Sequence, residues 1–191
     1  EQYPARAEFI LSGNIDTDKK HSHINTLLTR GKRVIAEVTT SAQTLQRIVG
    51  VSPTALFRAR QISQAGEFMA GSANNGAHAA NGLTALFIAT GQDVANVAES
   101  HSGILYTQVL DTGDYYWSIT LPSLILATHG GGTGLATQRE CLELLGCTGN
   151  GAAKKLAEIA AATVLAGEIS LASAVLAGDW VTGHEQLGRN R

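Results

Sequence analysis

A short polar segment near the start of the sequence crowds together titratable side chains of three kinds. The segment "GNIDTDKKHSHIN", residues 13–25, contains Asp16, Asp18, Lys19, Lys20, His21 and His23. A lysine in such a segment can act as an electrostatic clamp, because a fixed ammonium group stabilises an oxyanion that develops during a reaction. A neighbouring carboxylate would keep that ammonium group charged. The alternative interpretation is a solvated charged loop, which is the commoner situation for such a segment taken alone.

Four other features could contribute to a site. His78 and Asn81 are three positions apart on a predicted helix and so share a face, although a polar patch at a helix start has the same pattern. Asp93 stands where a helix could begin and could equally be an N-cap. The glycines of "HGGGTG", residues 129–134, would let backbone N–H groups approach an anion, but this is neither a Walker motif nor GxGxxG. His184 is a possible proton donor or an idle surface histidine.

Composition and motifs exclude two kinds of partner. His21 and His23 have the spacing of a strand face, but no third ligand is evident and no CxxC or HExxH motif occurs, so we expect no metal site. The formal net charge is −2, without the basic excess that phosphate backbones require. We therefore expect no nucleic acid partner.

The length and cysteine usage indicate a cytoplasmic protein. We expect 191 residues to form a single domain, 1–191, and Cys141 and Cys147 suit a reducing compartment. The opening "EQYPARAEFI" does not resemble a signal peptide. Two stretches without charged residues, 70–92 and 115–138, contain several glycines and a histidine each, and we expect neither to span a membrane. Charged residues make up only 16%, against about 25% in typical domains, which suggests surface hidden in subunit contacts.

The elements that must position these side chains follow from local patterns. Apolar or alternating runs predict strands at 7–13 and 33–40 and a hairpin over 104–122, whose turn contains Asp111, Thr112 and Gly113. Helices are predicted after Ser41, from Ser52-Pro53 through residue 71, and over 77–91, 135–146 and 152–178. Residues 178–191 are predicted to be a polar tail. Strands placed early and mid-chain with long helices after them predict an α+β fold, with helices packed on a small mixed or antiparallel sheet.

Taken together, these segments resemble a known enzyme family. The segments "SGNIDTDKKHSHIN", "AHAANGLTALFIATGQD", "LPSLILATHGGGTGLATQRECLELLG", "LAGEISLASAVLAG" and "GHEQLGR" occur in this order. They resemble the C-terminal part of the catalytic region of class I 3-hydroxy-3-methylglutaryl-CoA reductase. The resemblance covers nearly the whole chain from about residue 5. It implies the large-domain part of the reductase fold, without the small cofactor domain.

The resemblance implies a role for each candidate residue. That family reduces a thioester to an alcohol with two hydrides from NADPH, giving mevalonate and free coenzyme A. By motif, Lys19 resembles the lysine that stabilises the oxyanion, Asp93 the carboxylate that tunes it, and Asn81 the amide that orients it. His184 resembles the histidine that protonates the departing CoA thiolate. The crowded segment would then be a substrate loop for a dianionic acyl-CoA.

Two further groups of residues are implied by the same motifs. The residues that resemble the substrate-binding groups are Ser12, Asp18, Lys20 and His78. Those that resemble a nucleotide-contacting loop are Gly130, Gly131, Gly132 and Thr133. Because active sites in the family form between subunits, a homodimer or larger assembly is implied.

The sequence also departs from the family pattern. The family's catalytic glutamate and small cofactor domain lie well upstream of the lysine loop, and Glu8, the nearest acid here, is not in that glutamate's motif. Gly76 replaces an asparagine before "AH", and His129 a small aliphatic residue before "GGGT". Three interpretations stay open. The chain is a fragment or subunit completed by a second chain with the missing N-terminal half, a short relative that binds acyl-CoA without redox chemistry, or a structural partner subunit.

Overall fold

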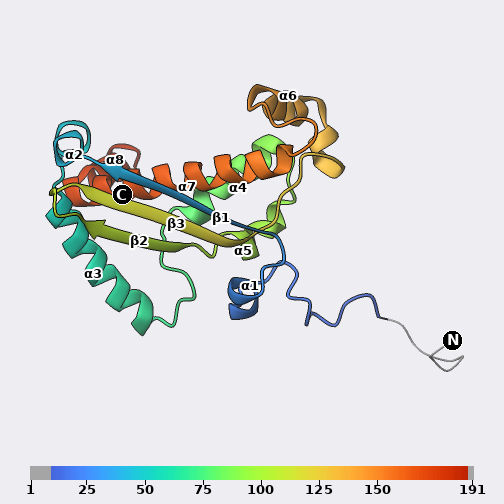
Figure 1. Cartoon of the computed structure of the whole chain (residues 1–191), viewed down its shortest axis with the longest axis horizontal. Coiled ribbons are helices and arrows are strands. Elements are labelled where there is room, and N and C mark those ends of the chain that lie inside the picture. The colour runs from blue at the N-terminus through green and yellow to red at the C-terminus, as the bar shows by residue number, and fades with distance from the viewer. Residues whose placement is uncertain (1–9, 189–191) are drawn as a thin grey trace, which may run out of the picture.

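The sheet has three antiparallel strands in the order β1-β3-β2. A computed structural model describes residues 10–188 and places β1 at Lys32–Thr40, β2 at Ile104–Val109 and β3 at Tyr115–Leu124 (Figure 1). The β2–β3 hairpin and the β1 strand are confirmed, and the sheet is antiparallel throughout. The α+β fold class is confirmed as well, because helices pack on this small sheet.

One face of the sheet forms the core and the other stays open. Along β3 the side chains of Tyr115, Trp117, Ile119 and Leu121 are buried, while the residues between them are only partly covered. This period of two is what a half-buried strand requires. On the open face Tyr106 of β2 is 53% exposed. The buried side chains of this face form the core together with those of α2, α3, α4, α6 and α7.

Helix α7 (Ala152–Ala177) is the central core helix. It packs on β1, β3 and α4, and its buried stripe includes Leu156, Ala160 and Val164. Small residues on that stripe let its backbone approach its neighbours. By length and composition alone α7 could cross a membrane, but here its buried stripe lies against the sheet and α4, as that of a core helix does.

Local capping signals explain the helices before and around α7. Ser41 and Ser52 cap α2 (Ala42–Val49) and α3 (Pro53–Met69), each accepting the backbone N–H three residues later. Helix α4 (Ala79–Thr90) ends at Gly91, whose φ of 69° is the left-handed conformation that glycine adopts without strain. The remaining elements are α1 (His23–Leu27), η1 (Val94–Asn96), α5 (Val97–Ser100), η2 (Gly131–Gly134) and α6 (Ala136–Leu144).

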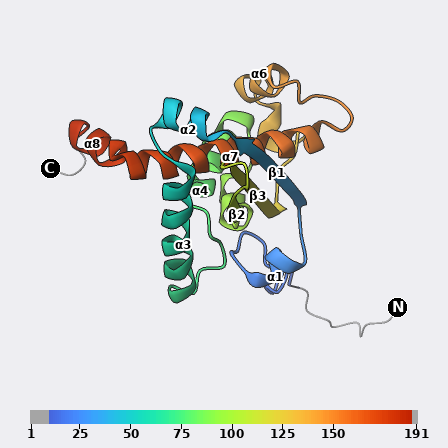
Figure 2. The same cartoon turned by 60° about the vertical axis from the view of Figure 1, so that its left-hand side comes forward.

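Two predictions about the chain ends differ from the structure. The segment after α7 is not an irregular tail but helix α8 (Asp179–Gln186), which extends from the end of α7 (Figure 2). The polar composition gives no sign of this helix, in which the ring of His184 packs on Trp180 as an (i, i+4) contact. At the other end, residues 10–13 form no strand; Ile10 and Leu11 are 79% and 89% exposed. Residues 7–9, including Glu8, lie outside the described residues.

Candidate active site at the Lys19–Asp93 ion pair

The loop that carries Lys19 adopts an unusual backbone conformation. Thr17 and Lys19 have φ values of 60° and 56°, in the left-handed region that non-glycine residues seldom occupy. The buried side chain of Asn25 in α1 holds the loop from below, because its Nδ2 donates to the carbonyl oxygens of Thr17 (3.2 Å) and Lys20 (2.8 Å). Such conformations persist only when their surroundings fix them. The loop is therefore a defined structure and not a freely solvated one.

Lys19 forms an ion pair with Asp93, which is distant in the sequence. Lys19 Nζ lies 2.8 Å from Asp93 Oδ2, and both side chains are roughly half exposed. Asp93 also caps η1, since its Oδ1 accepts the N–H of Ala95 at 3.1 Å. The hydrogen bond to Asp93 and its charge raise the pKa of Lys19, and the same contact lowers the pKa of Asp93. The lysine is thus held in its charged form beside an open surface.

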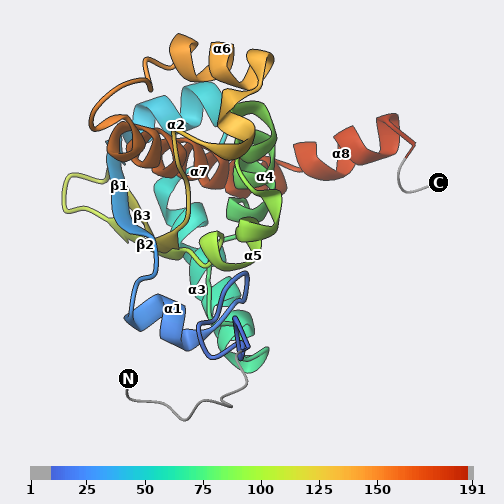
Figure 3. The ribbon, with the colours of Figure 1, turned by 90° about the vertical axis from the view of Figure 1, so that its right-hand side faces the viewer.

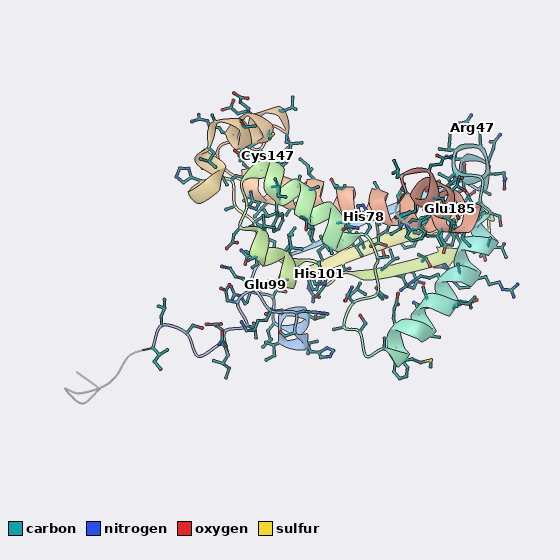
Figure 4. The ribbon with its side chains drawn as sticks, turned by 180° about the vertical axis from the view of Figure 1, so that it is seen from behind. Arg47, His78, Glu99, His101, Cys147 and Glu185 are labelled. Carbon is teal, nitrogen blue, oxygen red and sulfur yellow. The ribbon has the colours of Figure 1, made fainter. Side chains whose placement is uncertain are left out.

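A second carboxylate, which the sequence did not single out, lies beneath the same loop. Glu99 of α5 is fully buried, and its Oε1 accepts the backbone N–H of Lys19 at 3.0 Å. Its Oε2 lies 3.5 Å from Nε of Arg30. Figure 3 shows α5 directly beside the loop before α1, and Figure 4 shows Glu99 next to His101 at that junction. Glu99 was missed because a glutamate in "VANVAES" has no local signal of burial.

The remaining predicted residues of this loop interact mainly within it. Ser12 donates a hydrogen bond to Asp16, and Lys20 Nζ donates to the carbonyl oxygen of Asp18 at 3.2 Å. Asp18 Oδ1 accepts from Nη2 of Arg30 at 2.9 Å. The side chains of Ser12 and Lys20 are exposed, so a ligand can reach them from solvent.

Asp93 lines a cleft together with the predicted nucleotide loop. The cleft has a volume of about 570 Å³, and Asp93, Asn96 and residues 129–133 are among those that line it. Gln92 fixes the two sides of the cleft relative to each other, because its carboxamide exchanges two hydrogen bonds of 2.8 Å with the backbone of Ala127. Asn96 Oδ1 is buried without a hydrogen-bond partner among the described residues. Asn96 therefore lines the cleft, while this oxygen itself is closed to solvent.

Each glycine of the predicted nucleotide loop has its own structural reason. A Cβ at Gly132 would lie 2.7 Å from the carbonyl oxygen of Gly91, so this glycine is required where the loop meets the end of α4. Gly130 and Gly131 have positive φ values, and a Cβ there would meet open space. Thr133 is buried and donates to the Gly130 carbonyl oxygen at 2.7 Å. Gly131–Gly134 form the short helical turn η2, and Gly130 precedes it.

His78 and Asn81 both lie at the start of α4, where His78 is partly buried and Asn81 is exposed. His78 is the residue before the helix, and its ring packs against Gly167 of α7, where an added Cβ would lie 1.9 Å from Nδ1. The buried carboxylate of Glu168 accepts the backbone N–H groups of Ala77 (3.0 Å) and His78 (2.7 Å). Asn81 is exposed in the first turn. Glu168 and Gly167 thus fix the start of α4, while Asn81 faces outward.

His184 lies at the opposite end of the molecule from Lys19. Helix α8 projects away from the loop before α1 (Figures 2 and 3). The His184 ring lies 3.9 Å from that of Trp180, and its Nδ1 is 2.7 Å from the Trp180 carbonyl oxygen. Thr182 and Gly183 are inside the helix and provide no flexible hinge before His184. Within one chain, the structure does not bring this histidine to the ion pair.

The histidines near Lys19 do not form a metal centre. The rings of His21 and His101 contact each other edge to face at 5.3 Å. Burial, followed by the nearby His101 and His23, lowers the pKa of His21. Over residues 10–188, no group of three or more His, Cys, Asp or Glu side chains could hold a metal ion.

Comparison with known proteins gives one consistent family. The family described as hydroxymethylglutaryl-coenzyme A reductase matches residues 1–189. The 3-hydroxy-3-methylglutaryl-coenzyme A reductases of Aeropyrum pernix and Pyrococcus horikoshii are 46% and 42% identical over 99% of this chain, which covers 46% and 47% of their lengths. The Drosophila melanogaster reductase is 44% identical over 99% of the chain and 22% of its own length. The chain thus spans about half the length of the archaeal relatives.

Proposed function

The chain belongs to the hydroxymethylglutaryl-coenzyme A reductase family, and from this premise we propose that it forms part of an enzyme that reduces 3-hydroxy-3-methylglutaryl-CoA to mevalonate and CoA. The observation that carries the proposal is the 2.8 Å ion pair between Lys19 and Asp93. These two residues match the family's lysine and carboxylate by motif and are 74 positions apart in the sequence.

The ion pair suits the stabilisation of an oxyanion. Because Asp93 raises the pKa of Lys19, the ammonium group is charged throughout the neutral range. Its exposed side lets the thioester carbonyl oxygen approach it as negative charge develops on that oxygen. The buried supports of the loop hold the ammonium group in place beforehand, so little reorganisation is needed during the reaction. Ser12, Asp18 and Lys20 on the same loop would bind the hydroxymethylglutaryl end of the substrate.

The adjoining cleft fits part of a nicotinamide cofactor. At Gly130 and Gly131 a ligand can approach the backbone closely, because no side chain covers it. We assign residues 130–133 to contact with NADPH. When bound, each NADPH would supply one hydride, so the two hydrides of the reduction would come from two NADPH molecules in succession. The chain's own residues would orient the substrate carbonyl beside it and exclude water from the cleft.

Protonation of the leaving thiolate would require a second copy of the chain. His184 projects on α8 away from Lys19, so a homodimer or larger assembly would bring the His184 of one copy to the Lys19 of another. The glutamate and cofactor domain of the family would come from sequence outside these residues or from a second chain. The free Cys141 and Cys147 suit the reducing cytoplasm as the place of this reaction.

Turnover by the longest polypeptide that the gene encodes tests the proposal. NADPH consumption with 3-hydroxy-3-methylglutaryl-CoA is measured for the parent and for Lys19→Ala, with the exposed Lys154→Ala as the matched control. Loss of one oxyanion donor lowers kcat by about 10²–10³-fold, whereas the control keeps the parent rate. A Lys19→Ala rate within a few-fold of the parent would contradict the proposal. Binding of the acyl-CoA without NADPH consumption by the parent would favour the non-redox alternative.

A further inference from the structure

Glu99 is the one fully buried carboxylate that contacts the Lys19 loop in the described chain. Its exposed fraction is 0%, and its two oxygens face the Lys19 N–H (3.0 Å) and the Arg30 guanidinium (3.5 Å). A buried carboxylate is unfavourable unless hydrogen bonds and an opposite charge compensate it. A position that needed only to fill space would be occupied better by an apolar residue.

Glu99 contacts the loop at Lys19, where the backbone is strained. Lys19 has a φ of 56°, which is unfavourable for a residue with a long side chain. In this conformation the backbone N–H of Lys19 donates a hydrogen bond to Glu99. A hydrogen bond to a charged group is stronger than one to a neutral group, so Glu99 can hold a conformation that the residue itself disfavours.

Asp93 and Glu99 also belong to one short segment. Asp93 caps η1, α5 follows it without a break, and Glu99 lies in α5. The ammonium group of Lys19 is therefore bound by the first residue of this segment and its backbone N–H by a later one. Two points of attachment to the same segment fix both the position and the direction of the lysine side chain.

Arg30 completes the support on the other side of the loop. Its Nε faces Glu99, its Nη1 donates to the Asp16 carbonyl oxygen at 3.0 Å, and its Nη2 donates to Asp18 at 2.9 Å. The guanidinium thus compensates the buried charge of Glu99 and ties it to the residues just before Lys19.

We propose that Glu99 is a positioning residue, which holds the backbone of Lys19 in its left-handed conformation and adds negative potential at the Lys19 ammonium group. The consequence for catalysis rests on the proposed function of Lys19, but the positioning itself does not. Glu99 touches the lysine through its backbone, so its effect on the reaction would be exerted through Lys19.

Nuclear magnetic resonance of the 191-residue chain tests the positioning directly. Hydrogen exchange of the Lys19 amide and titration of the Lys19 amine are measured in the parent, in Glu99→Gln, which keeps an acceptor oxygen but loses the charge, and in Glu99→Leu, which loses both. The matched control is Glu143→Gln, which removes an exposed carboxylate paired with Arg139 on α6.

The two variants should act to different extents. Glu99→Leu should accelerate exchange of the Lys19 amide by about tenfold to a hundredfold, as expected when a hydrogen bond to a charged group is lost. Glu99→Gln should accelerate it less, and both should lower the pKa of Lys19, while Glu143→Gln changes neither. Unchanged exchange and titration in Glu99→Leu would overturn the proposal. If that variant does not fold, an unchanged Lys19 titration in Glu99→Gln would overturn it.

Activity separates this inference from the proposed function. In the longest polypeptide that the gene encodes, Glu99→Gln should lower kcat by about tenfold, which corresponds to one modest hydrogen-bonding contribution, with little change in KM. Absence of reductase activity in the parent would refute the proposed function, while the exchange and titration results would still decide the role of Glu99. An unchanged kcat in Glu99→Gln, with an active parent, would overturn the catalytic consequence.

Discussion

Replacing Gly167 by alanine tests whether α4 and α7 meet as closely as the structure places them. A Cβ at residue 167 would lie 1.9 Å from Nδ1 and 2.1 Å from Cε1 of His78. The ring already lies close to its own helix, because a Cβ added at Gly82 would lie 2.8 Å from Cε1. The His78 ring is thus enclosed between two glycines, and the added methyl group must displace the ring or separate the helices.

The expected loss follows from two opposing contributions. Overpacking of a close contact costs up to about 3 kcal/mol, and this contact is far inside van der Waals distance. Alanine in a helix interior regains about 1 kcal/mol relative to glycine. The net expectation is a loss of about 2 kcal/mol. At about 2–4 °C per kcal/mol for a chain of this size, Tm should fall by about 4–8 °C.

Thermal unfolding, followed by tryptophan fluorescence, measures this change. The matched control is Gly66→Ala within α3, where a Cβ would meet nothing within 4 Å, so helix propensity alone should raise Tm by a few degrees. In a His78→Ala background the obstacle is gone, and Gly167→Ala should then behave like the control. A rise in Tm for Gly167→Ala in the parent chain would refute the close packing of His78 on α7.

Three other outcomes follow from the site. The pKa of Lys19 is raised above 10.5 and that of Asp93 is lowered below 3.8, so their ion pair should persist across the neutral range. The pair should be lost only as pH falls through the lowered pKa of Asp93 or rises through the raised pKa of Lys19. An NMR titration that places the Lys19 midpoint below 10.5 would contradict this. His21 should titrate below 6.5, and His101→Phe should move its midpoint upward by removing a nearby positive charge, whereas an unchanged midpoint would argue against the ring contact. In the longest polypeptide, His184→Gln should slow thioester reduction by about 10²-fold as for a lost general acid, but should affect reduction of free mevaldehyde much less; equal losses would indicate a structural role.

Most elements of the fold could be predicted because their signals are local. Ser41 and Ser52 cap the following helices, and Gly91 ends α4, as their side-chain chemistry and backbone freedom predict. The hairpin of β2 and β3 follows from alternation around a Gly-containing turn. Each of these signals acts over a few residues and does not depend on distant partners.

The chain ends were mispredicted because their outcome depends on contacts between side chains and on available partners. An apolar run at 7–13 predicts a strand, yet residues 10–13 form none and Leu11 stays exposed. The polar composition of α8 predicts a tail, because a count of polar residues does not register the stacking of His184 on Trp180. The place of the His78 ring also depends on a distant partner, because Gly167 on another helix lies against it.

The candidate site depends on contacts that no periodic pattern encodes. Lys19, Asp93 and residues 130–133 all lie in irregular backbone or short helical turns, and resemblance to a family named them without explaining their geometry. The physical explanation comes from buried polar side chains that reach across the chain: Asn25 and Glu99 hold the lysine loop, and Gln92 ties Asp93 to the opposite side of the cleft. Each of these supports bonds to backbone groups, so the side chains of Lys19 and Asp93, to which we assign the chemistry, stay partly exposed. A substitution in a support should therefore disturb Lys19 without removing any group that contacts the substrate, which is the property that the Glu99 variants measure.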